Sequence, residues 1–533
     1  MNMYAYGFGP KGRERFIIVD AGVMFPDMET TPGVDLIMPD FDWLCERRNR
    51  VEALFLTHAH EDHVGAVPFV LEELDIPVFA RRFTAELTKR KIAEFDLNPS
   101  RIKEVRPTPQ KIKAGPFSVE FIPVSHSVPE SSSLLLEVGG NRVIHTGDLK
   151  LDCDPVLGSP FDSVHWSRLA EPGVRALICD STNVFSLREG RPEASVGPAF
   201  ADLLAKTKGA MAATTFASNL ARLKQLADAA KACGRSVVLL GRAMDRMVEV
   251  GRATGVLDGF PTTISTEEAR NLPRNKILLL TTGSQGEPRS ATAQLARGKF
   301  RGLELVAGDT LLFSSKTIPG NERSVARVMN RYAERGVRVI DDGAEIYHVS
   351  GHANRPDLAQ LYRLVRPECV VPMHGEYRHL VEHVQLAGDA GLTSFLVPNG
   401  TRLDISAMQV EDEAVHAGRL YLDGTELIGS DSGVVRKRQK LARMGLACVS
   451  IVPGRGSSSR CLTEVRLFGL PSDRNGLDEA EIAAEVAGAF GQTGVRRPAT
   501  DKDLRKRIES LVKQLVRTKI GKTPEVVVIV HRT

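Results

Sequence analysis

His58-Ala59-His60-Glu61-Asp62-His63 places three imidazoles and two carboxylates within six residues of a chain that has only 13 histidines. The apolar run from Ala53 to Thr57 precedes it and predicts a short buried strand. The cluster is therefore expected on the loop at the carboxyl end of that strand. Imidazole and carboxylate together suit zinc and similar divalent ions. The stretch predicts a metal site in preference to a polar loop that is merely rich in histidine.

Three further segments place a metal-type side chain at the end of an apolar strand, beside Gly, Ser or Pro. They carry His126 after a strand from Phe117 to Ile122, Asp148 after Arg142 to Ile144, and His374 after Cys369-Val370. A lone histidine of this kind is more often structural, but the repeated pattern favours one shared site. An aspartate such as Asp148 can bridge two cations through its two oxygens.

This pattern of ligand-type residues resembles the metallo-β-lactamase superfamily of hydrolases. The match consists of His58-x-His60-x-Asp62-His63, then His126, Asp148 and a late His374. Asp20, at the end of the apolar run from Phe16, matches the first-strand aspartate that supports the metal loop in that superfamily without binding metal. A role as a strand-end turn residue is the alternative for Asp20.

Other segments resemble the β-CASP nucleases and, among these, bacterial ribonuclease J. The segments are Ile178 to Asn183, Thr282 to Pro288, Ser314 to Glu322, and the loop Tyr347 to Ala353, which carries His348 and His352. The resemblance covers about Phe16 to Asn399 and weakens toward the end of the chain.

The resemblance implies a two-metal hydrolase, whereas spacing alone supplies only candidate ligands. It assigns His58, His60 and His126 to one cation. It assigns Asp62, His63 and His374 to the other, with Asp148 as the bridge. We expect two divalent ions per chain, zinc first, with Mn²⁺ or Mg²⁺ as alternatives. Two such ions can lower the pKa of a water molecule and hold phosphate oxygens.

The resemblance also implies the residues that move protons and bind substrate. Asp180 and His352 match its general acid–base positions, although Asp180 could instead be a strand-end cap. Two segments offer backbone N–H groups to a phosphate: the small-residue loop around Ser350, and a predicted helix start where N-capping is the alternative. The substrate-binding candidates are His348, Val349, Ser350, Gly351, His352, Ser218 and Asn219.

Alternating strand and helix signals predict an α/β protein with more than one domain. The middle block lacks metal-type residues, so it is expected as an insertion. With the resemblance, the expected fold is an αββα metallo-β-lactamase sandwich with an inserted β-CASP α/β domain and a small C-terminal α/β domain. The predicted ranges are 1–195 and 346–420 for the sandwich, 196–345 for the insert, 421–445 for a linker, and 446–533 for the C-terminal domain.

Composition restricts the class of protein. The 533 residues carry a net charge of only +4, so RNA would bind local patches, such as the basic run Arg436 to Lys440, in preference to a general basic coat. The seven cysteines include no CxxC pair, which favours a reducing cytoplasm. No apolar run reaches the ~20 residues of a membrane span, and no signal-peptide pattern is found.

The sequence therefore predicts a cytoplasmic, metal-dependent ribonuclease that hydrolyses RNA phosphodiesters in RNA maturation and decay. It is expected to be a 5′→3′ exonuclease with endonuclease activity on single-stranded RNA and to prefer a 5′-monophosphate end. The family resemblance implies a homodimer or larger assembly. The alternatives are a β-CASP nuclease acting on DNA, a metallo-hydrolase for a small ester, thioester or lactone, and an inactive RNA-binding scaffold. The large insert argues against the small substrate, and the complete ligand set argues against the scaffold.

Overall fold

The structure is a computed structural model, and it describes the whole chain except residues 342, 344–345, 453–460, 472–476, 492–499 and 532–533. The chain divides into two compact units. The first comprises Met1–Met24 with Met38–Ala417, and the second comprises Phe25–Ile37 with Gly418–Thr533. The α/β class predicted from the sequence is confirmed.

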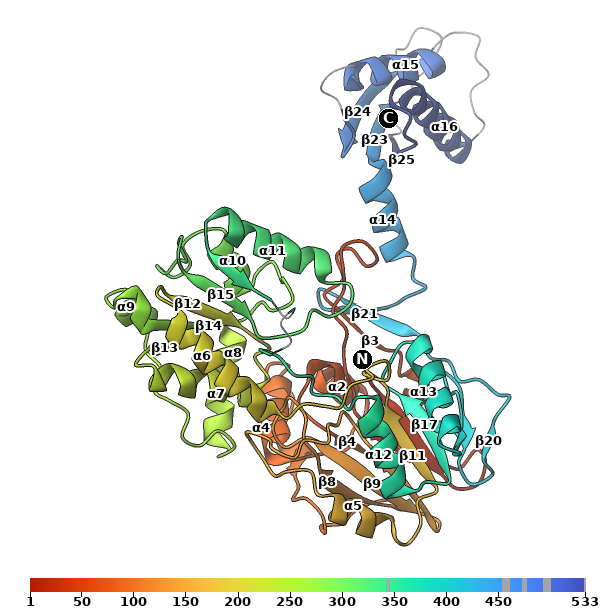
Figure 1. The fold of residues 1–533 in the computed structure, drawn as a ribbon. Coiled ribbons are helices and arrows are strands. Elements are labelled where there is room, and N and C mark those ends of the chain that lie inside the picture. The colour runs from red at the N-terminus through yellow and green to blue at the C-terminus, as the bar shows by residue number, and fades with distance from the viewer. Residues whose placement is uncertain (342, 344–345, 453–460, 472–476, 492–499, 532–533) are drawn as a thin grey trace. The chain divides into compact units, whose positions relative to one another are not determined.

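Two β-sheets belong to the metal-binding part of the first unit (Figure 1). They share an apolar core, in which Phe55 of one sheet meets Phe121 of the other. One sheet has the order β1-β2-β4-β5-β6 and the other β18-β17-β11-β10-β9-β8-β7. The strands of the first are β1 (Tyr4–Phe8), β2 (Arg15–Val19), β4 (Val51–Leu56), β5 (Val78–Ala80) and β6 (Ile102–Glu104). Those of the second are β7 (Ile112–Ala114), β8 (Phe117–Pro123), β9 (Ser132–Val138), β10 (Asn141–His145), β11 (Ala176–Asp180), β17 (Cys369–Met373) and β18 (Thr393–Ser394).

Helices cover the other face of the seven-stranded sheet. Trp166, Leu361 and Leu386 pack there, from α5 (Ser163–Ala170), α12 (Arg355–Val365) and α13 (Tyr377–Asp389). Further short elements of this region are α1 (Asp42–Cys45), η1 (Arg48–Arg50), α2 (Glu61–Val64), α3 (Val67–Glu73), α4 (Arg82–Ala93), η2 (Pro99–Arg101), β19 (Leu403–Asp404) and β20 (Gln409–Val410).

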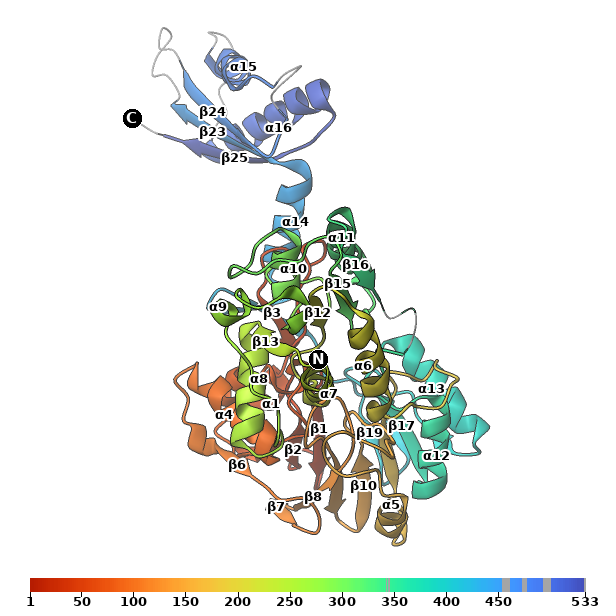
Figure 2. The same cartoon turned by 60° about the vertical axis from the view of Figure 1, so that its left-hand side comes forward.

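The inserted region is a parallel sheet of order β13-β14-β12-β15-β16 with helices on both faces (Figure 2). Both faces are buried, which explains why its strands are short apolar runs without alternation. Its strands are β12 (Met211–Thr214), β13 (Ser236–Leu240), β14 (Ile277–Thr281), β15 (Thr310–Phe313) and β16 (Arg338–Ile340). Its helices are η3 (Glu193–Ser195), α6 (Val196–Lys206), α7 (Leu220–Ala232), α8 (Arg242–Ala253), α9 (Thr266–Ala269), η4 (Arg274–Lys276), α10 (Ala291–Ala296) and α11 (Glu322–Glu334).

The second unit contains a three-stranded sheet of order β24-β23-β25, whose apolar core is formed with α15 and α16. The range 421–445, which the sequence suggests as a linker, includes most of the β21–β22 hairpin and all of α14, because its glycines lie in the turn and at the helix start. The elements are β21 (Arg419–Asp423), β22 (Glu426–Gly429), α14 (Val434–Met444), β23 (Leu446–Val452), β24 (Leu462–Phe468), α15 (Glu479–Gly491), α16 (Asp501–Ile520) and β25 (Glu525–Val530). Strand β3 (Leu36–Pro39) has its first two residues in this unit and its last two in the first unit. None of the helices within the described ranges is long and apolar enough to cross a membrane.

Candidate metal centre

The centre lies where strands of the two facing sheets end. Strands β10, β11 and β17 run parallel and adjacent, so the residues that follow them, Asp148 and His374 among them, share one edge of the sheet. Strand β4 of the other sheet ends just before His58. Facing strand ends thus bring together side chains that are 316 positions apart in the sequence, from His58 to His374.

The backbone near this edge has positive φ angles at two residues and one very close approach between two segments. Asp20 and His374 adopt positive φ angles of 60° and 53°, a conformation that costs about 1–3 kcal/mol in a residue other than glycine. Gly22 lies so close to the metal loop that an added Cβ would be 1.6 Å from the Asp62 carbonyl oxygen. A glycine is therefore required where the chain after β2 passes the histidine cluster.

One half of the centre is rich in imidazole. His60 Nδ1 is 3.1 Å from His58 Nε2 and 3.2 Å from His126 Nε2. Asp148 Oδ2 lies 3.5 Å from His58 Nε2 and 3.6 Å from His126 Nε2. Four tetrahedral ligands about 2.0–2.1 Å from a zinc ion lie about 3.3–3.4 Å from one another. The spacing of these four atoms matches such a shell.

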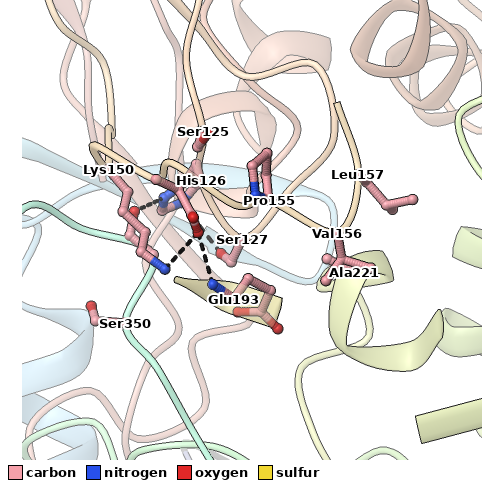
Figure 3. A pocket seen from close by; sticks show the side chains of 12 residues that line it. Ser125, His126, Ser127, Lys150, Pro155, Val156, Leu157, Glu193, Ala221 and Ser350 are labelled. Atoms are coloured by element: carbon pink, nitrogen blue, oxygen red, sulfur yellow. Dashed lines mark hydrogen bonds and ion pairs between the residues drawn. The ribbon is translucent and has the colours of Figure 1, made fainter. Parts of the chain in front are cut away.

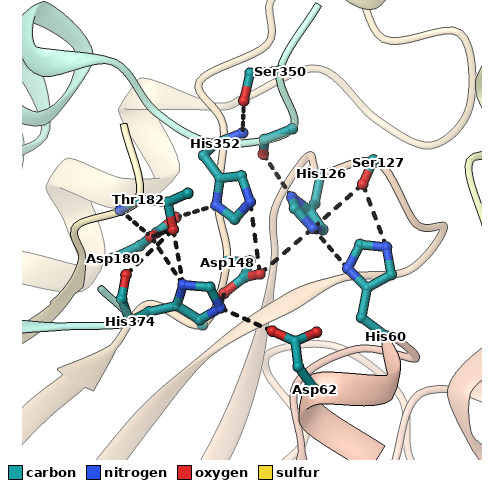
Figure 4. A network of polar contacts seen from close by, with 12 residues as sticks. His60, Asp62, His126, Ser127, Asp148, Asp180, Thr182, Ser350, His352 and His374 are labelled. Atoms are coloured by element: carbon teal, nitrogen blue, oxygen red, sulfur yellow. Dashed lines mark hydrogen bonds and ion pairs between the residues drawn. The ribbon is translucent and has the colours of Figure 1, made fainter. Parts of the chain in front are cut away.

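The other half is richer in carboxylate (Figure 4). His374 Nε2 is 3.2 Å from Asp62 Oδ2 and 3.4 Å from Asp148 Oδ1. His63 Nε2 is 3.5 Å from Asp62 Oδ2 and 3.4 Å from Asp148 Oδ1. The two oxygens of Asp148 therefore face different halves, as a bridging carboxylate would. Oδ1 is buried without a hydrogen-bond partner, which leaves its lone pairs available to a cation.

Hydrogen bonds to the outer ring nitrogens orient the imidazoles. The Thr57 hydroxyl donates to Asp20 Oδ2 and lies 3.0 Å from His58 Nδ1. The Thr182 hydroxyl repeats this arrangement with Asp180 Oδ1 and His374 Nδ1, at 2.7 and 2.8 Å. In both cases the hydroxyl donates to a carboxylate, so it must accept from the ring N–H. The opposite nitrogen, Nε2, then presents its lone pair to the centre.

The three remaining histidines are held in the same way. His63 Nδ1 is 2.7 Å from Asp20 Oδ2, and His126 Nδ1 donates to the Gly351 carbonyl at 2.6 Å. His60 Nε2 lies 3.1 Å from the Ser218 hydroxyl of the insert. All five imidazoles therefore aim a free nitrogen inward. With the unpartnered Asp148 oxygen, the donor set fits two divalent cations.

His352 and Asp180 form a pair beside the two clusters. His352 Nδ1 is 2.7 Å from Asp180 Oδ2, and its Nε2 is 4.0 Å from Asp148 Oδ2. Burial alone would lower the pKa of His352, but the neighbouring Asp180 and other carboxylates raise it to about 9. Burial would raise the pKa of Asp180, and the charge of His352 lowers it. The protein charges around the pair thus favour a protonated imidazole.

The residues predicted to bind substrate differ in their positions and contacts. Ser350 accepts hydrogen bonds from the Asn183 amide and the His352 N–H, while Val349 is buried. His348 instead lies against Arg222, at 3.4 Å. Asn219 is the N-cap of α7, where its side chain accepts from Arg222 N.

A pocket adjoins the centre at His126 (Figure 3). Its lining includes Ser127, Ser350 and the buried Lys150, whose ammonium is 2.9 Å from Asp152. Glu193, which also lines the pocket, binds Arg222 through both carboxylate oxygens. Lys150 and Arg222 are therefore already paired with carboxylates.

Four residues with clear structural roles had no assigned role from the sequence: Thr57, Thr182, Asn183 and Arg222. The two threonines adjoin predicted site residues, and their hydroxyls next to a strand-end histidine or aspartate were the available signal. Asn183 holds the loop of Ser350 and His352. Arg222 is fully buried in the first turn of α7, and its sequence context gives no signal for its partners.

Comparison with known families covers most of the chain. Residues 12–199 match the metallo-beta-lactamase superfamily, and 208–332 match "Ribonuclease J, beta-CASP domain". Residues 337–398 match "Zn-dependent metallo-hydrolase RNA specificity domain", and 433–533 match the ribonuclease J C-terminal domain. The predicted sandwich with an inserted β-CASP domain and a C-terminal domain is confirmed.

Individual proteins that are similar in sequence are also ribonucleases J. A ribonuclease J of Sinorhizobium meliloti is 42% identical over 460 residues, which is 85% of this chain and 80% of that protein. Ribonuclease J of Mycobacterium tuberculosis H37Rv is 39% identical over 89% of this chain and 86% of its own length. A crystal structure of a protein of unknown function from Enterococcus faecalis V583 is similar in fold, with a TM-score of 0.51 and 16% identity over 74% of this chain and 94% of that one.

Proposed function

The chain belongs to the ribonuclease J family of metal-dependent nucleases, and we propose that it degrades single-stranded RNA from the 5′ end, cuts RNA internally as well, and acts in RNA maturation and decay. The observation that carries the proposal is the pair of ligand clusters sharing Asp148, with the His352–Asp180 pair at their side. This arrangement suits a phosphodiester, whose hydrolysis needs both charge neutralisation and a proton for the leaving oxygen.

We assign two divalent cations to the centre, with zinc as the preferred identity. His58, His60 and His126 would hold one cation, and Asp62, His63 and His374 the other, with Asp148 between them. Bound divalent cations lower the pKa of water and neutralise charge that develops on a phosphate. The protein contributes fixed ligand directions, because each imidazole is already oriented by a hydrogen bond on its outer nitrogen.

We assign proton transfer to His352. Its Nε2 faces the centre while Asp180 holds Nδ1, so a proton on Nε2 is available to the departing 3′-oxygen of the upstream nucleotide. Asp180 both orients the ring and stabilises its charged form. Loss of the 3′-oxygen leaves a 5′-phosphate on the downstream RNA, so each product end can become the next substrate end.

The proposed preference for a 5′-monophosphate rests on the charges of the adjoining pocket. Ser127 and Ser350 offer hydroxyls there, while Lys150 and the nearby Arg222 are already paired with carboxylates. One phosphate could be satisfied by neutral donors, whereas the extra charge of a triphosphate would lack matching cations. The Ser218 hydroxyl, supplied by the insert at His60, is a further donor.

Two properties outside the centre are also proposed. In the second unit, Leu462, Phe468, Val527 and Ile529 are exposed apolar residues on the sheet face opposite the helices, which supports a homodimer or larger assembly. The seven free thiols support a reducing, cytoplasmic location.

Matched single-stranded RNAs with 5′-monophosphate, 5′-triphosphate and 5′-hydroxyl ends, plus the corresponding DNA, would test this function. Chelator-treated protein reloaded with Zn²⁺ or Mn²⁺ should release mononucleotides fastest from the 5′-monophosphate RNA. Internal fragments should appear more slowly, and protein without cations should be inactive. Equal rates on all three ends would remove the end preference and leave an endonuclease, and equal cleavage of DNA would contradict RNA specificity.

A further inference from the structure

The side chain of Asn2 lies among the ligand atoms of the carboxylate-rich half of the centre. Its Nδ2 atom is 3.0 Å from His63 Nε2 and 3.2 Å from Asp62 Oδ2. These are the same two atoms that would bind the cation shared with His374. Asn2 is only 6% exposed, so its amide is a buried polar group of the centre itself.

The backbone fixes Asn2 in this position. Its N–H donates to the Asp62 carbonyl at 2.8 Å, and its carbonyl accepts from Gly22 N at 2.9 Å. The Tyr4 hydroxyl is 2.8 Å from Asn2 Oδ1, and the Tyr4 ring packs edge-on against His145 at 4.8 Å. The amide is therefore held from both ends and cannot move far from His63 and Asp62.

The orientation of this amide determines its chemistry. A cation bound at His63 Nε2 uses the lone pair of that nitrogen, so the amide N–H 3.0 Å away would lose this acceptor and keep the Asp62 carbonyl, at 3.2 Å. Half a turn of the amide places the carbonyl oxygen in the same position, where it faces the cation. Oxygen and nitrogen of an asparagine amide are assigned from their partners, and a phenol both accepts and donates, so Tyr4 can accept from the turned amide.

We infer that Asn2 is an eighth protein ligand of the centre, whose side-chain carbonyl oxygen coordinates the cation held by Asp62, His63 and His374. The inference rests on the proposed two-cation site. It makes the two halves chemically unequal, with three imidazoles and one carboxylate against two imidazoles, two carboxylates and an amide oxygen. Oxygen donors suit Mn²⁺ and Mg²⁺, whereas imidazole suits Zn²⁺. The half that contains Asn2 is therefore the half that accepts Mn²⁺ more readily.

The test compares Asn2→Ala, Asn2→Asp and Tyr4→Phe in chelator-treated full-length protein. Asn2→Ala removes the ligand, and Mn²⁺ affinity at one of two sites should fall on the order of 10- to 100-fold, with a smaller loss for Zn²⁺. Asn2→Asp keeps an oxygen ligand and should bind Mn²⁺ as tightly as the wild type or more so. Tyr4→Phe keeps the amide and should change Mn²⁺ affinity least.

The sign of the Asn2→Asp effect separates a ligand from a hydrogen-bond donor. A donor replaced by a carboxylate would repel Asp62, so weaker Mn²⁺ binding in Asn2→Asp would overturn the inference. Co²⁺ provides a second readout, because its visible absorption strengthens when Asn2→Ala leaves it with fewer ligands. An unchanged Co²⁺ spectrum in Asn2→Ala would also overturn it, and melting temperatures identify any variant that fails to fold.

These measurements do not depend on RNA cleavage. Wild-type protein that binds two cations but does not cleave RNA would contradict the proposed function and leave the assignment of Asn2 standing. Wild-type protein that cleaves RNA, with Asn2→Ala binding both cations normally, would overturn only the assignment of Asn2.

Discussion

The seven-stranded sheet of the metal-binding region and the five-stranded sheet of the insert both have parallel strands that end in loops of small and polar residues. The strand ends of the first carry Asp148, Asp180 and His374. Those of the second carry hydroxyls, such as Ser218 and Ser314. The same architecture therefore carries the proposed ligands and proton-transfer pair in one region, and in the other it carries hydroxyls that hold neighbouring groups in place.

Contacts between the two regions show how they cooperate. The fully buried Arg222 of the insert binds Glu193 and donates to the carbonyls of Ser314 and Tyr347. Tyr347 begins the loop that carries Ser350 and His352. The insert thus fixes the start of a loop whose end carries the proposed proton donor, and substitutions in the two regions should have effects of different kinds.

The largest effect is expected in the metal-binding region, for Asp148→Ala. Removal of the carboxylate that faces both halves should abolish hydrolysis and reduce metal content from about two divalent ions per chain. Metal analysis and RNA cleavage provide the measurement. Glu61→Gln is the matched control, because this neighbouring carboxylate binds Lys91 and belongs to neither ligand cluster. Cleavage near the wild-type rate by metal-depleted Asp148→Ala protein would contradict the two-cation proposal.

A smaller effect is expected for His352→Ala, which leaves both ligand clusters intact. Loss of the proton donor should slow turnover on the order of 10²–10⁴-fold, with a much smaller change in RNA affinity. Single-turnover cleavage and RNA binding, measured on the same substrate, separate the two quantities. If binding and turnover fall in parallel, His352 is a phosphate contact and not a general acid.

Arg222→Met, in the insert, should act mainly on stability and least on turnover. The substitution leaves the buried Glu193 without its partner, which costs about 3–5 kcal/mol in the free energy of unfolding. Denaturant unfolding measures this loss. The control is Arg90→Ala, which breaks two surface ion pairs, with Glu86 of α4 and with Glu249 of α8, each worth about 0–1 kcal/mol. Equal losses in the free energy of unfolding of the two variants would show that burial does not make the Arg222–Glu193 pair more important for stability than a surface pair.

A second variant separates charge from positioning. In Arg222→Met combined with Glu193→Leu, no buried carboxylate is left unpaired, so stability should recover in large part. Turnover should stay lower than in the wild type, because the Tyr347 carbonyl loses the Arg222 guanidinium and keeps only the Ser314 hydroxyl as a donor. Full recovery of turnover would show that Arg222 has no role in positioning the catalytic loop.

Much of the fold and most of the candidate ligands could be predicted from the sequence for a local physical reason. Apolar runs define strands, and the ends of parallel strands share an edge, so His58, His126, Asp148 and His374 identify a common site. The family resemblance supplied the grouping of ligands and the pair His352–Asp180. The predicted ranges of the domains stay predictions, and the sequence did not indicate that residues 25–37 belong to the second unit.

Other features depend on contacts that sequence patterns do not encode. Asn2 lies at the centre because the chain before β1 pairs with the loop of Asp62, and nothing in its neighbours distinguishes it from a surface asparagine. Arg222 has an ordinary helical context, and its function comes from Glu193 and Tyr347, which lie 29 and 125 positions away. The sequence determined which side chains end the strands, because that is a property of neighbouring residues. Only the tertiary structure decided which atoms face one another, because packing brings distant residues within hydrogen-bond distance.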